Sequence, residues 1–436
     1  MEPDDTAIPE PPDAPELGGP TRVRPRTILI GALAAIVVAT LLYAVAPWIL
    51  PARIREGPVV QLASTDAVTL VWYTTRPAAC TVRVNIDGHE RVAAAQTDGR
   101  RNRVRVTGLV AGTRYPYEIR TGDRKLISGL AFQTNRTSDE RYTFIVFGDS
   151  GMGTRGQYLL AAQMADAQPP VDFLLHTGDM VYPAGLRKDY EERFFAPYRR
   201  LLAHVDLWPC LGNHDVQKDG SAPAYHEIFE SRDDGPPGRP AGDNYWFDYA
   251  SSRIAVLDSN VDEATLRDRI APWLSTVMAA PEPRWRFVVF HHPPYTNGKH
   301  RENVSAQRVL VPVIEATGVD IVFNGHDHNY QRTKPLREGQ IVAPAAGVVY
   351  VVTGAGGAER YEVREPHPDW LAASDYQHFS FTQVTIDGAD LTLRQIAMDG
   401  NVLDEYRMRK AAPGDKGAPP TSAPATAPAG SDPREP

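Results

Sequence analysis

Residues 142–150 read YTFIVFGDS, an apolar and aromatic run that ends in a glycine and an aspartate. The same plan recurs at 171–179, VDFLLHTGD, and at 319–328, VDIVFNGHDH, while 286–291, RFVVFH, ends directly in a histidine. Short β-branched or aromatic runs predict strands that are buried on both faces. The polar residue after each run is then expected where loops gather, at the carboxyl edge of a mostly parallel sheet.

Side chains that bind metals stand at the ends of five such stretches. They supply two carboxylates, a phenol, an amide oxygen and three imidazoles: Asp149, Asp179, Tyr182, Asn213, His291, His326 and His328. A single Gly-Asp pair is more often only a turn, and a His-x-His pair can arise by chance. Five stretches at strand ends together predict two neighbouring metal ions, a common device for cleaving phosphate esters.

Two domains of different style are expected after residue 50. Residues 55–136 show short alternating strands, with Val68, Leu70 and Trp72 on one face and a turn at Asp87-Gly88, and no helical segment intervenes. This pattern predicts a β-sandwich, and it resembles a fibronectin type III-like domain. Residues 140–410 alternate buried strands with helical spacing near 155–167, 187–203, 262–278 and 303–317, which predicts an α/β domain.

The ends of the chain have their own signals. Residues 27–50 form an uncharged apolar run, roughly 36 Å long as a helix at about 1.5 Å per residue, and predict a transmembrane helix. Arginines at 22, 24 and 26 favour a cytoplasmic N-terminus, so both domains would lie outside the cytoplasm. The alternative is a signal peptide cleaved near 44–46, with a secreted product. Residues 1–26 and 411–436 are rich in proline and polar or small residues and are predicted to be disordered.

The net charge argues against one class of partner, and the two cysteines indicate free thiols rather than a disulfide. The formal net charge is −8, which argues against nucleic acid as a partner. Cys80 and Cys210 fall in different predicted domains, and two buried free thiols are favoured over a disulfide between them.

Taken together, these motifs resemble the calcineurin-like metallophosphoesterases and, within them, the purple acid phosphatases. Asp149 lacks the His two residues on that the wider superfamily carries, Tyr182 lies three residues past Asp179, and residues 325–332 read GHDHNYQR. The resemblance spans roughly 55–405 and implies a four-layer α/β/β/α sandwich. It also implies one metal held by Asp149, Asp179, Tyr182 and His328. The second would be held by Asp179, Asn213, His291 and His326, with Asp179 bridging.

The resemblance further implies the chemistry. Tyr182 as a ligand suits Fe(III), paired with a divalent ion such as Zn, Fe, Mn or Mg. The expected activity is that of an acid phosphatase acting on small phosphorylated substrates, by attack of metal-bound hydroxide on a phosphate monoester. His214 and His300 are the candidate proton donors, His300 lying nine residues past His291. The alternatives are a phosphodiesterase or nucleotide pyrophosphatase, and a catalytically inert surface binding protein.

For several other residues near these motifs, the sequence predicts a supporting, core, turn or pocket-lining role. His292 is expected to support its neighbour His291 or to pack, and His176 is expected in the core. Gly354–Gly357 is expected to form a tight turn that brings backbone close to the site, because the P-loop lysine is missing. Further candidates for lining the substrate pocket are Tyr295, Asn297, Tyr330 and Arg332.

Overall fold

The computed structural model describes residues 36, 40, 50–138, 140–280 and 282–410. The predicted disordered ends lie outside these residues, as does nearly all of the predicted membrane segment at 27–50. Within the described part of the chain, no helix is long and apolar enough to cross a membrane. From Ala52 onward the described residues belong to one compact unit, so the two predicted domains pack together.

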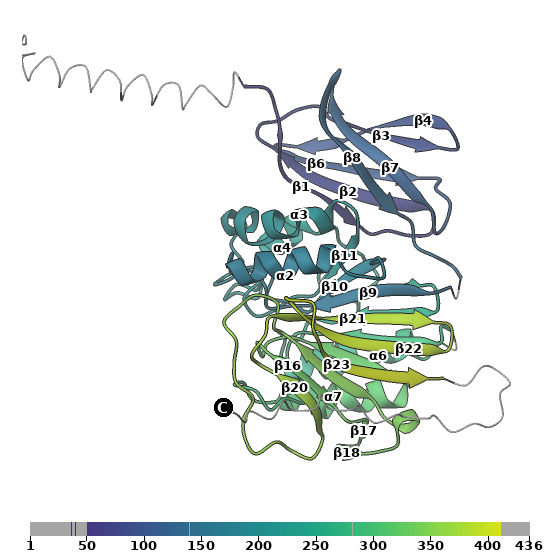
Figure 1. The fold of residues 1–436 in the computed structure, drawn as a ribbon, viewed down its shortest axis with the longest axis vertical. Helices are drawn as coiled ribbons and strands as arrows, with labels where there is room; N and C mark the ends of the chain where they lie inside the picture. Colours follow the sequence, from purple (N-terminus) through teal and green to yellow (C-terminus); the bar gives the residue numbers. More distant parts are fainter. Residues whose placement is uncertain (1–35, 37–39, 41–49, 139, 281, 411–436) are drawn as a thin grey trace, which may run out of the picture. The chain divides into compact units, whose positions relative to one another are not determined.

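The first part of this unit is a β-sandwich of two antiparallel sheets (Figure 1). One sheet has the order β1-β2-β6-β5, with β1 at Ile54–Gln61, β2 at Ala67–Thr74, β5 at Gln96–Asp98 and β6 at Arg101–Thr107. The other has the order β4-β3-β7-β8, with β3 at Thr81–Ile86, β4 at His89–Ala94, β7 at Arg114–Thr121 and β8 at Arg124–Gln133. The predicted sandwich is confirmed, and its kinship with fibronectin type III domains stays a prediction.

Strand β2 is buried on both faces, although its alternation predicts burial on one. Val68, Leu70 and Trp72 lie in the core of the sandwich, as expected. Val71 and Tyr73, on the opposite face, join a second apolar cluster in which Tyr73 meets Phe195 of the α/β part, with ring centroids 6.0 Å apart. The second face is covered because the sandwich packs against the α/β part.

Two mixed sheets form the centre of the α/β part. The first has the order β11-β10-β9-β21-β22-β23: β9 at Tyr142–Phe147, β10 at Phe173–His176, β11 at Asp206–Pro209, β21 at Ser380–Asp387, β22 at Asp390–Ala397 and β23 at Val402–Arg409. Strands β9, β10 and β11 are parallel, and the C-terminal hairpins extend the sheet antiparallel to β9.

The second sheet has the order β12-β13-β14-β15-β19-β16-β20. Its strands are β12 at Tyr245–Tyr249, β13 at Ser252–Val256, β14 at Trp285–Val289, β15 at Ile321–Asn324, β16 at Tyr330–Thr333, β19 at Val349–Thr353 and β20 at Leu371–Asp375. The parallel strands are β13, β14, β15 and β19. A small hairpin, β17 at Leu336–Arg337 and β18 at Gln340–Ile341, stands apart.

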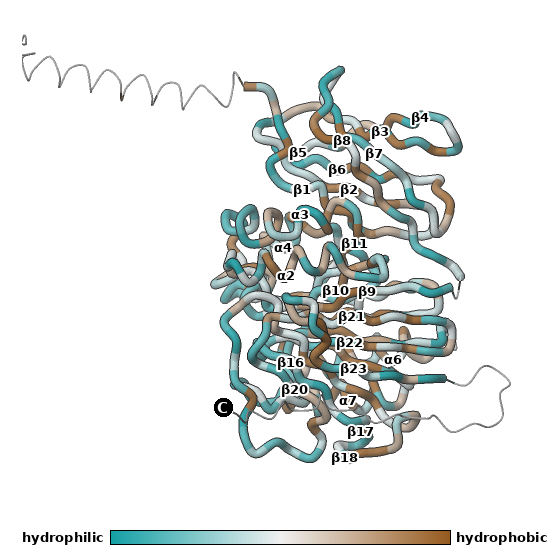
Figure 2. Tube along the Cα trace, in the orientation of Figure 1, coloured by the Kyte–Doolittle hydropathy of each residue, from teal (hydrophilic) through white to brown (hydrophobic). Residues whose placement is uncertain are grey.

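The two sheets face each other across a core of aromatic and branched side chains, among them Phe144, Phe287 and Phe323. Helices α2 (Arg155–Ala165), α3 (Ala196–Leu202) and α4 (Pro223–Ile228) cover the outer face of the first sheet. Helices α6 (Ala271–Met278) and α7 (Val304–Ala316) cover the outer face of the second. The layers are therefore α/β/β/α, and Figure 2 shows apolar residues concentrated along the strands between them.

Two of the predicted helical segments are built from more than one helical form. The segment 187–203 contains a 3₁₀ turn (Arg187–Asp189), a π-helical stretch (Glu191–Phe195) and then α3. The segment 262–278 contains α5 (Glu263–Thr265), a π-helical stretch (Leu266–Ile270) and α6. In both, a proline occupies the first turn of the following α-helix. Cys80 and Cys210 are buried free thiols, as predicted.

Candidate metal centre

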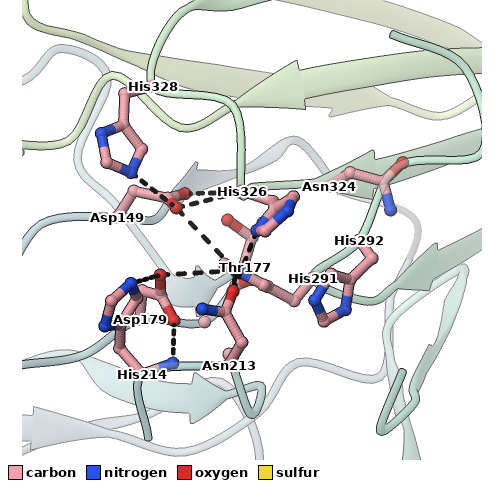
Figure 3. A network of polar contacts seen from close by, with 12 residues as sticks. Asp149, Thr177, Asp179, Asn213, His214, His291, His292, Asn324, His326 and His328 are labelled. Atoms are coloured by element: carbon pink, nitrogen blue, oxygen red, sulfur yellow. Dashed lines mark hydrogen bonds and ion pairs between the residues drawn. The ribbon is translucent and has the colours of Figure 1, made fainter. Parts of the chain in front are cut away.

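The seven predicted ligands converge beyond the carboxyl ends of strands from both sheets, and Figure 3 labels six of them, all except Tyr182. Asp149 follows β9, Asp179 and Tyr182 follow β10, and Asn213 follows β11. His291 follows β14, and the pair His326 and His328 lies in the loop between β15 and β16. The structure thus brings together side chains that are far apart in the sequence, as the strand-end pattern predicted.

One group of donors surrounds the phenol of Tyr182. Its Oη lies 2.9 Å from Oδ2 of Asp179, 3.3 Å from Oδ1 of Asp149 and 2.9 Å from Nε2 of His328. The Nε2 atom of His328 is in turn 3.6 Å from Oδ1 of Asp149. All four side chains are buried.

A second group surrounds the amide oxygen of Asn213. Its Oδ1 lies 3.0 Å from Nε2 of His291 and 2.9 Å from Nδ1 of His326. The same Nε2 of His291 lies 3.5 Å from Oδ2 of Asp179. Asp179 therefore belongs to both groups.

Main-chain acceptors fix which imidazole nitrogen faces the centre. His291 donates from Nδ1 to the carbonyl oxygen of Thr177, 2.8 Å away, and His328 donates from Nδ1 to that of Glu359, 2.6 Å away. In each ring the other nitrogen, Nε2, then points into the site. Such outer hydrogen bonds are the usual way in which proteins orient a metal-binding histidine.

Glycines are required where the loops crowd against the carboxylates. A Cβ on Gly212 would lie 2.1 Å from Oδ1 of Asp179, and one on Gly325 would lie 2.4 Å from Oδ2 of Asp149. The two aspartates themselves have left-handed backbone, with φ of 54° at Asp149 and 57° at Asp179. Strained backbone of this kind collects at functional sites, where the surroundings must hold it.

The charge balance of the pocket calls for a cation. Asp149 and Asp179 are fully buried, and among the described residues neither forms an ion pair with a lysine or arginine. Burial raises the pKa of Asp149 well above its usual range, and the Asp179 carboxylate adds to the rise. Burial also raises the pKa of the Tyr182 phenol, with both carboxylates contributing. Burial lowers the pKa of His291, but the two aspartates outweigh it and raise that pKa to about 9, so this imidazole supplies one positive charge. A bound metal ion would supply the rest.

Asp215 supports the site from behind, a role that the sequence analysis did not assign. Its carboxylate accepts hydrogen bonds from the N–H groups of Met180 and Gly212, both at 2.9 Å, and so ties the loops after β10 and β11 together. Burial raises the pKa of Asp215 to about 7. The only sequence signal was its place in the string GNHD at 212–215.

His292 lies closer to the centre than a packing role requires. Nitrogen atoms of His291, His292 and His326 lie within 4.8 Å of one another, and the rings of His292 and His326 are 4.5 Å apart. Its Nδ1 is 2.8 Å from the hydroxyl of Ser259. The sequence expected support or packing, and the structure places this imidazole within reach of a metal.

The two candidate proton donors lie beside different donor groups. His214 packs its ring on Tyr182, with centroids 4.5 Å apart, and its Nδ1 hydrogen bonds with the carbonyl oxygen of Pro183. The ring of His300 lies 4.0 Å from that of His326. Its main-chain N–H donates to Asp327, and the structure records no hydrogen bond from the imidazole to another described residue. Burial lowers the pKa of His300, and Asp327 opposes that effect.

The structure also agrees with the expectations for His176 and for the turn at Gly354–Gly357. His176 is buried against Phe147, as predicted for a core residue. The turn at Gly354–Gly357 does bring backbone close to the site, because a Cβ on Gly354 would lie 2.2 Å from the carbonyl oxygen of Asp327.

The expectation for Tyr330 and Arg332 as pocket-lining residues is wrong. Tyr330 lies in the core between the sheets and donates to Asp404, and Arg332 forms a buried ion pair with the same carboxylate. Both belong to β16, and their side chains are directed to Asp404.

Family models match most of the α/β part. Residues 142–330 match the calcineurin-like phosphoesterase model, and residues 347–405 match the model described as iron/zinc purple acid phosphatase-like protein C. The junction between the two falls just before β19, so the second model begins with the strand that carries the glycine turn.

Similar curated proteins are plant phosphatases and related enzymes. A probable inactive purple acid phosphatase from Arabidopsis thaliana is 26% identical over 311 residues, 62% of this chain and 50% of its own length. A nucleotide pyrophosphatase/phosphodiesterase from Hordeum vulgare is 26% identical over 306 residues, 61% of this chain and 82% of its own length. The chain spans about half the length of two of the relatives that it matches.

Solved structures agree on the fold. A purple acid phosphatase from yellow lupin (Lupinus luteus) seeds superposes with a TM-score of 0.71 at 19% identity, covering 81% of this chain and 74% of the lupin chain. The structure of PhoD superposes with a TM-score of 0.59 at 14% identity, covering 80% and 88%. Residues 142–330 are therefore similar to calcineurin-like phosphoesterases and residues 347–405 to the C-terminal part of purple acid phosphatases, and the fold agrees with that of the lupin enzyme.

Proposed function

We propose that this chain is a binuclear-metal hydrolase of phosphate monoesters, of the purple acid phosphatase type. One observation carries the proposal: two groups of metal-binding donors share Asp179 and enclose a buried aspartate pair that has no lysine or arginine partner among the described residues. The charged partners of these carboxylates among the described residues are histidines, which are themselves metal-binding side chains.

The donor spacing fits two ions. Two ligands bound at about 2.1 Å and at right angles to each other are roughly 3 Å apart. The distances around Tyr182 and Asn213 run from 2.9 to 3.5 Å. In this assignment one ion is held by Asp149, Asp179, Tyr182 and His328, and the other by Asp179, Asn213, His291 and His326.

The donor types suggest which metals bind. A buried phenol between two carboxylates keeps its proton unless a strongly acidic ion displaces it, and Fe(III) is such an ion. The second group, with two imidazoles and an amide oxygen, suits Zn, Fe, Mn or Mg. We therefore propose Fe(III) with one divalent ion.

Two histidines of the chain then have different roles in the reaction. When bound, the metal pair supplies water of lowered pKa and offsets the charge on the phosphate oxygens. His300, with a ring free of hydrogen bonds to other described residues, gives a proton to the leaving oxygen as its bond to phosphorus breaks. His214 lies beside Tyr182, where it can bind the phosphate and hold a proton on Nε2. The products are an alcohol and inorganic phosphate.

A substrate panel tests this function. The full chain, purified with its metals, is assayed on a mono-aryl phosphate, a bis-aryl phosphate and ATP, with Asn213→Ala as the variant that loses one metal and the exposed Asn85→Ala as its control. The monoester should turn over fastest, and Asn213→Ala should bind one ion fewer by metal analysis. Asn85→Ala should match the wild type.

The same panel separates the alternatives. The relative from barley, a nucleotide pyrophosphatase/phosphodiesterase, favours a second reading in which ATP or the diester is the better substrate. Two relatives are named as probable inactive purple acid phosphatases, which favours the alternative of a catalytically inert binding protein. Two bound metals without hydrolysis of any of the three esters would support that reading, although this chain retains all seven donors.

A further inference from the structure

A second site lies where β1, β8 and α3 meet, and it has no residue in common with the candidate metal centre. It is a cavity of ≈ 410 Å³. Five of its lining side chains are cationic and none is acidic: Arg53, Arg55, Arg124, Lys125 and Arg199. The chain as a whole has a net charge of −8, so this concentration of positive charge is opposite to the average surface.

Three of these cations lack an acidic partner. Arg55 pairs with Glu191 at 2.5 Å, and Lys125 pairs with Glu118 at 2.9 Å. For the side chains of Arg53, Arg124 and Arg199, the structure records no ion pair or hydrogen bond with another described residue. Guanidinium groups that gather without partners repel one another, and an anion with several oxygen acceptors relieves that repulsion.

The cavity also offers apolar surface between the cations. Ile54, Leu126 and Ile127 line it and are partly buried against the core of the sandwich. A free phosphate ion would use only the charges. An anion attached to hydrocarbon would use both kinds of surface.

Chain connectivity suggests where such an anion would come from. The apolar run at 27–50 ends three residues before Arg53, and three residues span at most about 11 Å. A bilayer places its charged headgroups in a layer just outside the hydrocarbon, within that reach. Cationic clusters next to a membrane segment attract anionic lipids.

We propose that this cavity binds the headgroup of an anionic phospholipid and so fixes the β-sandwich against the membrane surface. The proposal rests on the predicted membrane segment at 27–50, and it is independent of the phosphatase activity. Binding would hold the start of β1 and the edge strand β8 at the bilayer.

Lipid retention tests the proposal with the full chain. The protein is reconstituted in vesicles of equal parts phosphatidylcholine and phosphatidylglycerol, extracted into mild neutral detergent, and the retained lipids are counted by native mass spectrometry. Wild-type protein should retain phosphatidylglycerol over phosphatidylcholine by at least about tenfold. The variant Arg53→Gln/Arg124→Gln/Arg199→Gln should lose most of that preference and retain the two lipids to within about twofold of each other.

A matched variant controls for net charge. Arg114→Gln/Arg141→Gln/Arg269→Gln removes three exposed arginines that do not line the cavity, and it should keep the wild-type preference. Thermal unfolding verifies that both variants are folded. Equal retention by all three proteins would overturn the proposal.

Two further results would also overturn it. If 10 mM inorganic phosphate added during extraction removes the phosphatidylglycerol, the cavity binds soluble anions instead. If the chain does not incorporate into vesicles, the membrane premise fails. Hydrolysis of aryl phosphates, measured on the same preparations, reports separately on the proposed function.

Discussion

The phenol oxygen of Tyr182 lies 2.9 Å from Nε2 of His328, a residue 146 positions further along the chain. Tyr182 belongs to the loop after β10 of the first sheet, and His328 to the loop after β15 of the second. The contact therefore spans the junction of the two sheets, and it places a phenol where a metal would meet both a carboxylate and an imidazole.

Replacing Tyr182 by Phe should remove the colour of the iron-loaded protein. The Tyr182 ring packs on His214, so Phe keeps that packing while it removes the oxygen. A tyrosinate-to-iron absorption band in the visible spectrum is the measurement. Tyr190→Phe is the control, because the Tyr190 hydroxyl is buried with no recorded hydrogen-bond partner, and it should keep the band. A Tyr182→Phe protein with an unchanged band would show that the phenol is not an iron ligand.

Replacing His300 by Ala should slow esters according to their leaving groups. A poorly leaving alkyl alcohol needs a proton as its bond to phosphorus breaks, so its turnover should fall by about 10²–10⁴. An activated aryl ester needs little help and should lose much less. The measurement is kcat for both esters with each protein, and His367→Ala, an exposed histidine outside the site, serves as control. A similar loss on both esters would exclude proton donation by His300.

Removing Arg187 should loosen the attachment of the β-sandwich. Arg187 donates to Glu56, which is 5% exposed, at 2.5 Å and to Glu227 at 2.8 Å, and its guanidinium lies 4.4 Å from the ring centroid of Tyr73. Arg187→Leu leaves the Glu56 carboxylate buried without a cation, which should cost about 2–4 kcal/mol of unfolding free energy.

Denaturant unfolding measures that cost. Adding Glu56→Gln to Arg187→Leu should recover part of the stability, because no unpaired charge then remains buried. Arg267→Leu, which removes an exposed ion pair with Asp268, should change stability little. Additive losses in the double variant would mean that the pair is not coupled.

Asp206 should make stability fall as pH rises. It is buried beside the sandwich, Oδ2 accepts from the N–H of Ala63 at 3.1 Å, and Oδ1 has no recorded partner. Burial raises the pKa of Asp206 to about 8, above about 4 for an unfolded aspartate. The folded state therefore binds the Asp206 proton more tightly than the unfolded state does. The stabilisation that this gives is present in full below pH 4. Between pH 4 and pH 8 the free energy of unfolding falls by roughly 1.4 kcal/mol per pH unit.

Asp206→Asn carries no charge and should remove that slope. The free energy of unfolding is measured at pH 5, 6.5 and 8 for the wild type, for Asp206→Asn and for the exposed control Asp98→Asn. The free energy of unfolding of Asp206→Asn should rise relative to that of the wild type as pH rises. Asp98→Asn should show the same pH dependence as the wild type. A constant difference at all three pH values would mean that Asp206 ionises normally in the folded protein.

The strand-end pattern succeeded because it depends on local sequence. The apolar runs in 142–150, 171–179, 286–291 and 319–328 form β9 (Tyr142–Phe147), β10 (Phe173–His176), β14 (Trp285–Val289) and β15 (Ile321–Asn324), within about two residues of the runs themselves. Parallel strands end at a shared edge, so the residues that follow them could be assigned to one site from the sequence alone.

Contacts between segments that are far apart in the chain could not be predicted from local sequence patterns. The burial of both faces of β2, the support that Asp215 gives to two loops and the position of His292 beside His326 each depend on elements that meet only in the folded chain. The error over Tyr330 and Arg332 has the same origin. Their proximity in sequence to His328 suggested the pocket, but β16 turns them toward Asp404.

The sequence by itself determined the strands and the places of the seven candidate donors at their ends, because these follow from apolar periodicity and from residue types. The four layers were expected from the family resemblance. Only the tertiary structure decided which donor atoms lie within contact of one another, which imidazole nitrogen faces inward, and that no lysine or arginine among the described residues pairs with the aspartates. It also gathered three unpaired arginines around one cavity. Distances and burial set the strength of each electrostatic interaction, and both arise only when segments far apart in the chain are packed together.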